Sequence, residues 1–190
     1  MYWTCCDAFL LPENQLQEAY ERLTPSRKAH IDRLRQPDDK IRALAGEILV
    51  QNLLKAHCGI TSARLHRKEN GQPYLTGCQL CVSISHSQRM VACAVSHQPV
   101  GIDIEHIRPI NLNLLRHVCV EEEMRYVLDG EWEEQKGNDP AVMRRFYEIW
   151  TAKEARFKKQ GTGITNLKSL CVLPLEGQRY EMGEYLLQIL

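Results

Sequence analysis

The sequence predicts an α+β fold made of two similar halves, and three observations support this. Helical and strand patterns occur in the order helices then strands, twice over. Apolar residues make up 44% and charged residues 25% of the 190 residues, which is typical of a globular protein. Scaling of surface with mass indicates that folding buries roughly 70% of the chain's surface, enough for a core without disulfides. The joint is expected near residues 105–110, so that the halves are residues 1–105 and 106–190.

The first half is expected to begin with two helices and to continue with strands. Thr24 is a good N-cap, and Pro25 suits the first helical position, where its missing N–H costs nothing. Apolar residues then recur at helical spacing up to His57, and Gly59 follows where helices commonly end. A turn is predicted at Asn70-Gly71. Alternation and a continuous apolar run predict the three strands, at residues 80–85, 90–95 and 100–105.

The second half repeats this order. Its helical segments are residues 112–118, residues 121–128 and a long helix that begins at Asp139-Pro140 and ends at Gly161. Its strands are expected at residues 169–173 and 185–190.

Charge and cysteine content argue against several classes of protein. Because 24 Lys and Arg balance 24 Asp and Glu, a general electrostatic grip on nucleic acid is not expected. No apolar run reaches the ~20 residues that span a bilayer, and residues 1–11 lack the basic region of a signal peptide. The eight cysteines include one C-x-x-C, Cys78 to Cys81, with no second pair to complete a zinc site. We expect a cytoplasmic chain with reduced thiols and no nucleic-acid or membrane partner.

Two carboxylates, Asp103 and Glu105, stand at alternate positions of the strand predicted over residues 100–105. They project from one face, roughly 7 Å apart, while the other face is apolar. A pair of carboxylates on a rigid strand suits a hard divalent cation, Mg²⁺ in particular. The alternative is an ordinary solvated strand face.

Three side chains share one face of the long helix, because Trp150, Glu154 and Lys158 are spaced by four residues. They are either a core tryptophan beside an exposed ion pair or the groups of a functional site.

Three further residues are candidates for binding an anion. His86 follows a strand, where a protonated imidazole can meet an anion. Ser85 precedes it, but no G-x-S-x-G surrounds the serine, so a hydrolase nucleophile is not indicated. Arg42 lies one turn before Gly46, where a glycine either admits a ligand or marks close packing.

Taken together, these motifs resemble those of the 4′-phosphopantetheinyl transferases. The resemblance rests on Gly101-Ile102-Asp103-Ile104-Glu105 followed by Trp150-x-x-Lys153-Glu154-x-x-x-Lys158. Upstream, Gly71-Gln72-Pro73 and Ser83-Ile84-Ser85-His86-Ser87 stand where the Sfp-type branch has G-K-P and N-x-S-H-S blocks. Residues 24–46, with Arg42, resemble the helical region of that branch.

The sequence departs from the family pattern at three places. Gln72 replaces the lysine of G-K-P, and Ser83 replaces the asparagine of N-x-S-H-S. The family's F-S-x-x-E-like stretch is fitted loosely by residues 118–122, so we assign its acidic position to Glu122, with Glu121 and Glu123 as alternatives. The carboxyl end is short.

The resemblance implies a reaction and its partners. It implies transfer of 4′-phosphopantetheine from coenzyme A to a serine of an apo acyl or peptidyl carrier protein, with Mg²⁺ required and adenosine 3′,5′-bisphosphate released. Carriers of fatty-acid, polyketide and nonribosomal peptide biosynthesis all remain open. The implied fold is a monomeric pseudodimer of two α+β halves with the active site in the cleft between them.

The resemblance also implies roles for individual residues. The metal ligands would be Asp103, Glu105 and Glu122. The catalytic groups would be Glu154, as base or as a further metal ligand, Lys158, which offsets leaving-group charge, and Lys153, which reaches the phosphates or orients Glu154. Coenzyme A would be bound by Arg42, Ser85, His86, Arg27 and His30, together with Lys153 and Lys158.

Two other functions are open at this point. A metal-dependent pyrophosphate hydrolase would use the same carboxylates but release its product to water. A non-catalytic module that binds coenzyme A or a carrier protein would tolerate the departures at Gln72 and Ser83.

Overall fold

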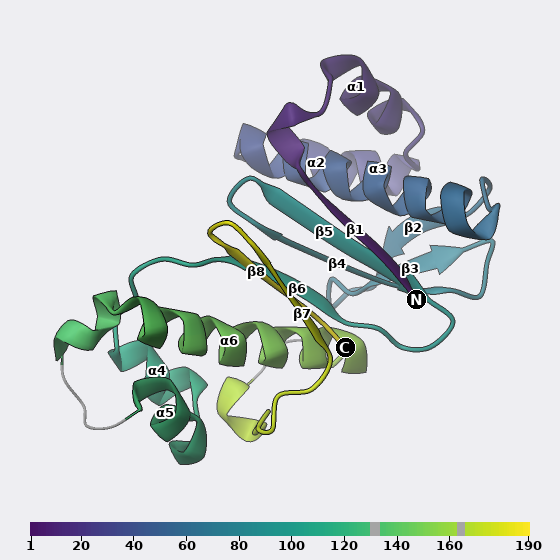
Figure 1. Ribbon diagram of the computed structural model, residues 1–190. Coiled ribbons are helices and arrows are strands. Elements are labelled where there is room, and N and C mark those ends of the chain that lie inside the picture. The colour runs from purple at the N-terminus through teal and green to yellow at the C-terminus, as the bar shows by residue number, and fades with distance from the viewer. Residues whose placement is uncertain (130–133, 163–165) are drawn as a thin grey trace. The chain divides into compact units, whose positions relative to one another are not determined.

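The computed structural model describes residues 1–129, 134–162 and 166–190 (Figure 1). The chain divides into two compact units, residues 1–100 and 101–190. The division falls at residue 100 rather than at residue 105, because strand β6 (Ile102–His106) pairs with strand β8 (Tyr185–Ile189) of the second unit.

The first unit is a three-stranded antiparallel sheet covered by a long helix. The sheet has the order β1-β5-β4, formed by Tyr2–Asp7, Met90–Ser96 and Cys81–Ser87. Helix α3 (Pro37–Cys58) lies along one face of this sheet (Figure 1). It ends at Gly59, whose φ of 67° is in the left-handed region that favours glycine. The core between helix and sheet is built from leucine, valine and alanine side chains of α3, β4 and β5.

Four smaller elements complete the first unit. They are a 3₁₀ turn at Ala8–Leu10, helices α1 (Glu13–Glu21) and α2 (Pro25–Asp32), and a hairpin of β2 (Arg64–Arg67) with β3 (Pro73–Thr76). The hydroxyl of Thr24 accepts a hydrogen bond from the Arg27 amide, so the predicted N-cap of α2 is confirmed.

The second unit repeats the plan of a long helix on a three-stranded antiparallel sheet. The strands are β6, β8 and β7 (Gln178–Met182), in the order β6-β8-β7. Helix α6 (Pro140–Gln160) packs against β6 and β8, and the Asp139 carboxylate caps its first turn. The remaining elements are α4 (Asn113–Val118), α5 (Glu121–Leu128) and 3₁₀ turns at Glu134–Asn138 and Leu167–Ser169.

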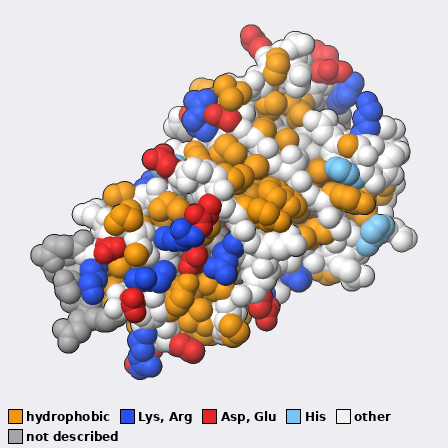
Figure 2. Space-filling view, in the orientation of Figure 1, with side chains coloured by type: hydrophobic (Ala, Val, Ile, Leu, Met, Phe, Trp, Pro, Cys, Tyr) orange, Lys and Arg blue, Asp and Glu red, His pale blue; other side chains and the backbone are white. Residues whose placement is uncertain are grey.

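Each unit therefore contains helices and antiparallel strands, so the α+β fold class is confirmed. Among the helices described, none has both the length and the apolar stretch that a bilayer span requires. Figure 2 shows positive and negative side chains interspersed over the second unit, where Arg179 pairs with Glu148 and Arg156 with Glu176. Such mixing accords with a formal net charge of zero.

The strand expected at residues 169–173 is wrong. That segment is the end of a 3₁₀ turn followed by irregular backbone, and buried side chains form hydrogen bonds with its backbone groups. The Lys153 ammonium donates to the carbonyls of Leu167 and Leu170, and the Val172 amide donates to a Glu123 carboxylate oxygen. Because these side chains satisfy the backbone, the segment needs no partner strand.

Candidate active site

The centre of the candidate site is built where strand β6 meets helix α6. Gly101 immediately precedes β6, and a Cβ there would lie 1.8 Å from the carbonyl oxygen of Ala155. Only glycine permits this approach, because any side chain would collide with the helix backbone. The contact brings the start of β6 against the last two turns of α6, which carry Glu154 and Lys158.

Lys158 pairs with Asp103 rather than standing as an exposed partner of Glu154. Its Nζ lies 2.6 Å from Asp103 Oδ1, and the Asp103 side chain is only 3% exposed. Glu105, two residues along the same strand, accepts a hydrogen bond from the indole N–H of Trp150 at 3.3 Å. The solvated strand face and the exposed helical ion pair are both excluded by this arrangement.

The electrostatics of Glu154 are unusual for a carboxyl group. Its pKa is raised to about 7, chiefly by burial and also by the neighbouring Asp103 and Glu105 carboxylates, against the opposing effect of Lys158. Glu154 is 8% exposed. A group with this pKa changes protonation near neutral pH, as a general base should.

The chemistry of these donors fits Mg²⁺. The pKa of Glu154 shows that three carboxyl groups interact there, and carboxylate oxygens are the protein ligands that this hard cation takes. In the arrangement described, the Lys158 ammonium supplies the compensating charge at Asp103. Within residues 1–129, 134–162 and 166–190, no three acidic, histidine or cysteine side chains gather closely enough to form a metal-binding group.

The structure places the three glutamates considered for the third acidic position in different surroundings. The side chains of Glu121 and Glu122 are exposed, whereas Glu123 is 0% exposed and pairs with Lys153 at 2.7 Å. One oxygen of Glu123 also accepts from the Val120 amide, which closes the first turn of α5. Glu123 is thus the buried acidic residue of the three. The sequence did not signal this position, because the N-cap residue Val120 has no capping side chain.

The structure also places Lys153 differently from the expected contact with phosphates. Its ammonium is 0% exposed and is held by the Glu123 carboxylate and the carbonyls of Leu167 and Leu170. An ammonium has three hydrogens to donate, and three partners surround this one. Lys153 therefore fastens residues 167–170 to helix α6, and it does not offer a cation to a ligand.

In the first unit, Arg42 joins the beginning of α3 to the end of β4. Its guanidinium donates to the Gln88 carbonyl at 2.9 Å and to Asp39 at 2.6 Å. The exposed His86 lies two residues before Gln88, near the end of β4, where it pairs with Val91 of β5. Arg42 and His86 therefore belong to one end of the helix–sheet layer, as a shared ligand would need.

Packing explains the glycine near Arg42, and strand geometry separates Ser85 from His86. A Cβ on Gly46 would lie 3.4 Å from an Ile84 methyl group, so this glycine marks close packing of α3 on the sheet. Ser85 is buried, and it alternates with the exposed His86 along β4. Because successive strand residues point to opposite faces, Ser85 and His86 do not form a nucleophile–base pair.

Arg27 and His30 lie one helical turn apart on α2, within a cluster of cations. The buried Arg27 guanidinium lies 2.7 Å from the buried Glu47 carboxylate. Partial burial lowers the pKa of His30, and the guanidinium groups of Arg27, Arg67 and Arg33 lower it further. A bound anion would reverse the effect of these cations, so His30 suits a phosphate better than a neutral ligand.

Comparison with known protein families decides the identity of the fold. The model described as "4'-phosphopantetheinyl transferase superfamily" matches residues 99–187, and the one described as "4'-phosphopantetheinyl transferase, N-terminal" matches residues 12–99. The chain belongs to the 4′-phosphopantetheinyl transferase superfamily. The two matches meet at residue 99, next to the division between the two units.

Individual transferases of the superfamily are similar to this chain over much of its length. The transferase Sfp of Bacillus subtilis is 30% identical over 78% of this chain and 66% of its own. The transferase HetI of a Nostoc species is 29% identical over 84% of this chain and 68% of its own. The transferase gsp of Aneurinibacillus migulanus is 34% identical over 66% of this chain and 51% of its own. The chain thus matches between about half and two thirds of these relatives, and the Sfp-type resemblance is confirmed.

Proposed function

We propose that this chain transfers 4′-phosphopantetheine from coenzyme A to a serine of an apo carrier protein and releases adenosine 3′,5′-bisphosphate. The observation that carries the proposal is the Lys158–Asp103 pair at 2.6 Å beside Glu154, whose pKa is raised to about 7. A base that ionises near neutral pH and a cation near two carboxylates suit attack of a hydroxyl on a phosphoryl group. The transferase names of the similar proteins support the same reaction.

In the proposed reaction the carrier serine attacks the phosphorus atom next to pantetheine. The serine proton passes to Glu154, directly or through water, and the bond to the oxygen of the leaving nucleotide breaks. The Lys158 ammonium then offsets the charge that builds on that oxygen, where stabilising the transition state raises the rate most. Asp103 holds this ammonium in place until the substrate phosphates compete for it.

Mg²⁺ is proposed as the cofactor, held by Asp103 and Glu105 together with a third carboxylate that the bound ion would draw in, from Glu122 or Glu154. When bound, it would neutralise pyrophosphate oxygens that otherwise repel an attacking hydroxyl. Glu154 then has two candidate tasks, as a metal ligand and as the proton acceptor. Glu122, whose side chain is exposed, remains the third ligand that the family resemblance implies.

Coenzyme A is proposed to be anchored through its 3′-phosphate by residues of the first unit. Arg42 and His86 lie at one end of α3 and β4, and Arg27 and His30 supply further cations from α2. A charge-assisted hydrogen bond to a phosphate is worth about 1.5–3 kcal/mol, so each contact would matter to affinity. Ser85 is proposed to lie beside the adenine end.

The proposal is tested by the mass of an apo carrier protein after incubation with this chain, coenzyme A and Mg²⁺. A gain of one phosphopantetheine, with equimolar adenosine 3′,5′-bisphosphate, is expected. Breakdown of coenzyme A at the same rate with and without carrier would instead identify a pyrophosphate hydrolase. Binding of coenzyme A with no change in either molecule would identify a non-catalytic binding module.

A further inference from the structure

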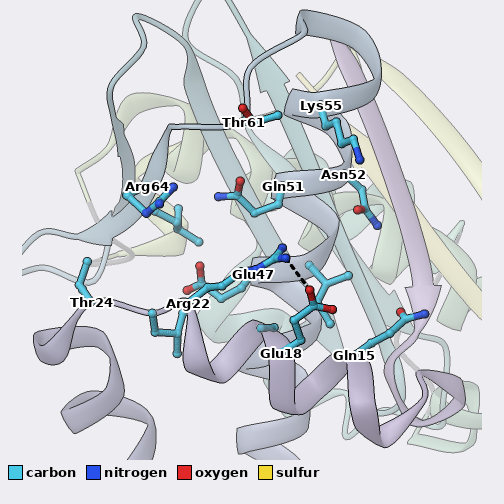
Figure 3. A pocket seen from close by; sticks show the side chains of 14 residues that line it. Gln15, Glu18, Arg22, Thr24, Glu47, Gln51, Asn52, Lys55, Thr61 and Arg64 are labelled. Carbon is cyan, nitrogen blue, oxygen red and sulfur yellow. Dashed lines mark hydrogen bonds and ion pairs between the residues drawn. The ribbon is translucent and has the colours of Figure 1, made fainter.

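The first unit contains a cavity that the proposed reaction does not use. Its volume is about 730 Å³, and it lies among helix α1, helix α3 and the start of strand β2 (Figure 3). Pockets of roughly 300–1,000 Å³ are the usual size for small-molecule sites. Its labelled lining side chains are polar, and they include the amides of Gln15, Gln51 and Asn52 and the hydroxyl of Thr61 (Figure 3).

The cavity lies along a different part of α3 from Arg42, the residue proposed to bind the 3′-phosphate. Glu47, Gln51 and Lys55 follow one face of the helix at intervals of four residues and line the cavity. Arg42 lies near the beginning of α3 and bonds to Gln88, and neither residue lines the cavity. A ligand in the cavity would therefore share no contact with Arg42, and it would meet the proposed coenzyme A cations only through Glu47, which pairs with Arg27.

The charges around the cavity leave a surplus of positive charge. Glu18 pairs with Arg22, and the buried Glu47 pairs with Arg27 at 2.7 Å, so both acids are compensated. Arg64 donates only to the carbonyls of Ser62 and Ala63. In the described part of the chain, neither Arg64 nor Lys55 has an acidic partner.

We propose that this cavity is a binding site for a small organic dianion, either a dicarboxylate or a phosphate monoester. Lys55 and Arg64 reach it from α3 and from β2, and Figure 3 shows Gln51 between them. These two cations would bind the acidic groups, because such bonds are about twice as strong as neutral ones. The amides and the hydroxyl can donate and accept hydrogen bonds with the uncharged part of the ligand.

Ligand binding should also order helix α1, which forms one wall of the cavity. None of the nine residues of α1 is fully buried, so few apolar contacts hold this helix on α3. Regions with few buried contacts open most readily. A ligand that bridges Lys55 and Arg64 beside α1 would therefore slow amide hydrogen exchange in Glu13–Glu21.

The test is titration calorimetry of the full chain with two matched pairs of probes. Succinate is compared with succinamide, and glucose 6-phosphate is compared with glucose. At least one anion should bind, and its neutral analogue should bind ten- to a hundredfold more weakly. Binding of succinate alone identifies a carboxylate site, and binding of glucose 6-phosphate alone identifies a phosphate site.

Variants locate the binding. Lys55→Gln should weaken the anion about ten- to a hundredfold and remove the protection of α1, whereas the exposed Arg35→Gln should change neither. Arg64→Lys keeps the positive charge and should retain most of the affinity for the anion. This conservative variant tests the charge at position 64 with little risk of unfolding the chain. The proposal is overturned if no anion binds, if neutral analogues bind equally, or if Arg42→Ala abolishes binding that Lys55→Gln leaves intact. Because no probe is coenzyme A, these outcomes are independent of the proposed transferase activity.

Discussion

At the scale of single residues, Glu154 combines a functional pKa with a cost in stability. The carboxyl group is buried beside Asp103 and Glu105, and its pKa of about 7 lies well above the ordinary value of 4.5. Between these values the folded chain keeps a proton that the unfolded chain has released. The contribution of Glu154 to stability therefore falls as pH rises through this window, and the loss is complete above pH 7.

Because ionised Glu154 destabilises the fold, Glu154→Gln should stabilise the metal-free chain at alkaline pH. The neutral amide cannot ionise, so the free energy of unfolding of the variant should exceed that of the natural chain by up to about 3 kcal/mol at pH 8. The difference should shrink towards pH 5. Urea denaturation of both proteins with a chelator, across this pH range, measures it. A difference independent of pH would mean that Glu154 is ionised in the folded state throughout.

Glu123 and Glu122 are adjacent, but substitution of Glu123 should reduce stability far more than substitution of Glu122. Glu123→Ala leaves the buried Lys153 ammonium without its carboxylate, and breaking such a pair costs about 3–5 kcal/mol. Glu122→Ala removes an exposed side chain and should change stability by less than about 0.5 kcal/mol. Urea denaturation of the two variants tests this contrast. Equal losses would contradict the assignment of Glu123 as the structural acid.

Arg42 is expected to bind the 3′-phosphate of coenzyme A. Loss of one charge-assisted hydrogen bond should raise the apparent KM for coenzyme A by roughly ten- to a hundredfold in Arg42→Ala. The same variant should barely change the KM for 3′-dephospho-coenzyme A, which lacks that phosphate. Steady-state assays with both donors make the comparison. If both donors are weakened equally, Arg42 does not contact the 3′-phosphate.

At the scale of secondary-structure elements, the packing of β6 on α6 places the carboxylates beside Glu154 and Lys158. Gly101→Ala would put a methyl group 1.8 Å from a helix carbonyl, so strand and helix must separate. We expect a loss of more than about 3 kcal/mol in the free energy of unfolding, together with loss of transfer activity.

Gly46→Ala is the matched control for this effect. Its methyl group would lie 3.4 Å from Ile84, an ordinary contact distance, and alanine is favoured over glycine within a helix by about 1 kcal/mol. The control should therefore be neutral or slightly stabilising in urea denaturation. Similar losses in both variants would show that the close approach at Gly101 is not the cause.

Local sequence patterns predicted the helices well, because their caps and periodicity are encoded by neighbouring residues. Thr24 and Gly59 mark helix ends that the structure confirms. Strand β1 was not predicted, since its pairing partner β5 is distant in sequence. Helix α1 and strands β2, β3 and β7 were also missed; these strands form local hairpins, but their sequences lack a clear alternation of apolar and polar residues. The strand expected at residues 169–173 is wrong because two buried side chains bind its backbone, which periodicity does not reveal.

Motif order predicted the set Asp103, Glu105, Glu154 and Lys158, which the structure brings together. It did not distinguish Glu123 from Glu122, because residues 121–123 are all glutamate. They differ only in whether the side chain is buried or exposed in the fold. It also gave Lys153 a ligand role, although that lysine is consumed by internal hydrogen bonds. Spacing therefore predicted which groups lie together, whereas the role proposed for each group also depends on its burial and its partners.

At the scale of the whole molecule, the two units hold different parts of the proposed chemistry. The second unit holds the acid, base and lysine groups, and the first unit holds the cations proposed for coenzyme A. Each unit has its own helix-on-sheet core, and each matches its own family model. Substitutions of Glu154 or Lys158 in the second unit should therefore lower kcat, and substitutions of Arg42 or His86 in the first unit should raise the KM for coenzyme A.

The most direct test of the account is the single-turnover rate of carrier modification by Glu154→Gln and Lys158→Ala, with saturating carrier and coenzyme A. Loss of the base should slow transfer by about 10²–10⁴-fold, and loss of the lysine should also reduce the rate substantially. The double variant should lose less than the product of the two single effects, because the groups act in one transition state. Losses below twofold in both single variants would contradict the account and leave these residues with a structural role alone.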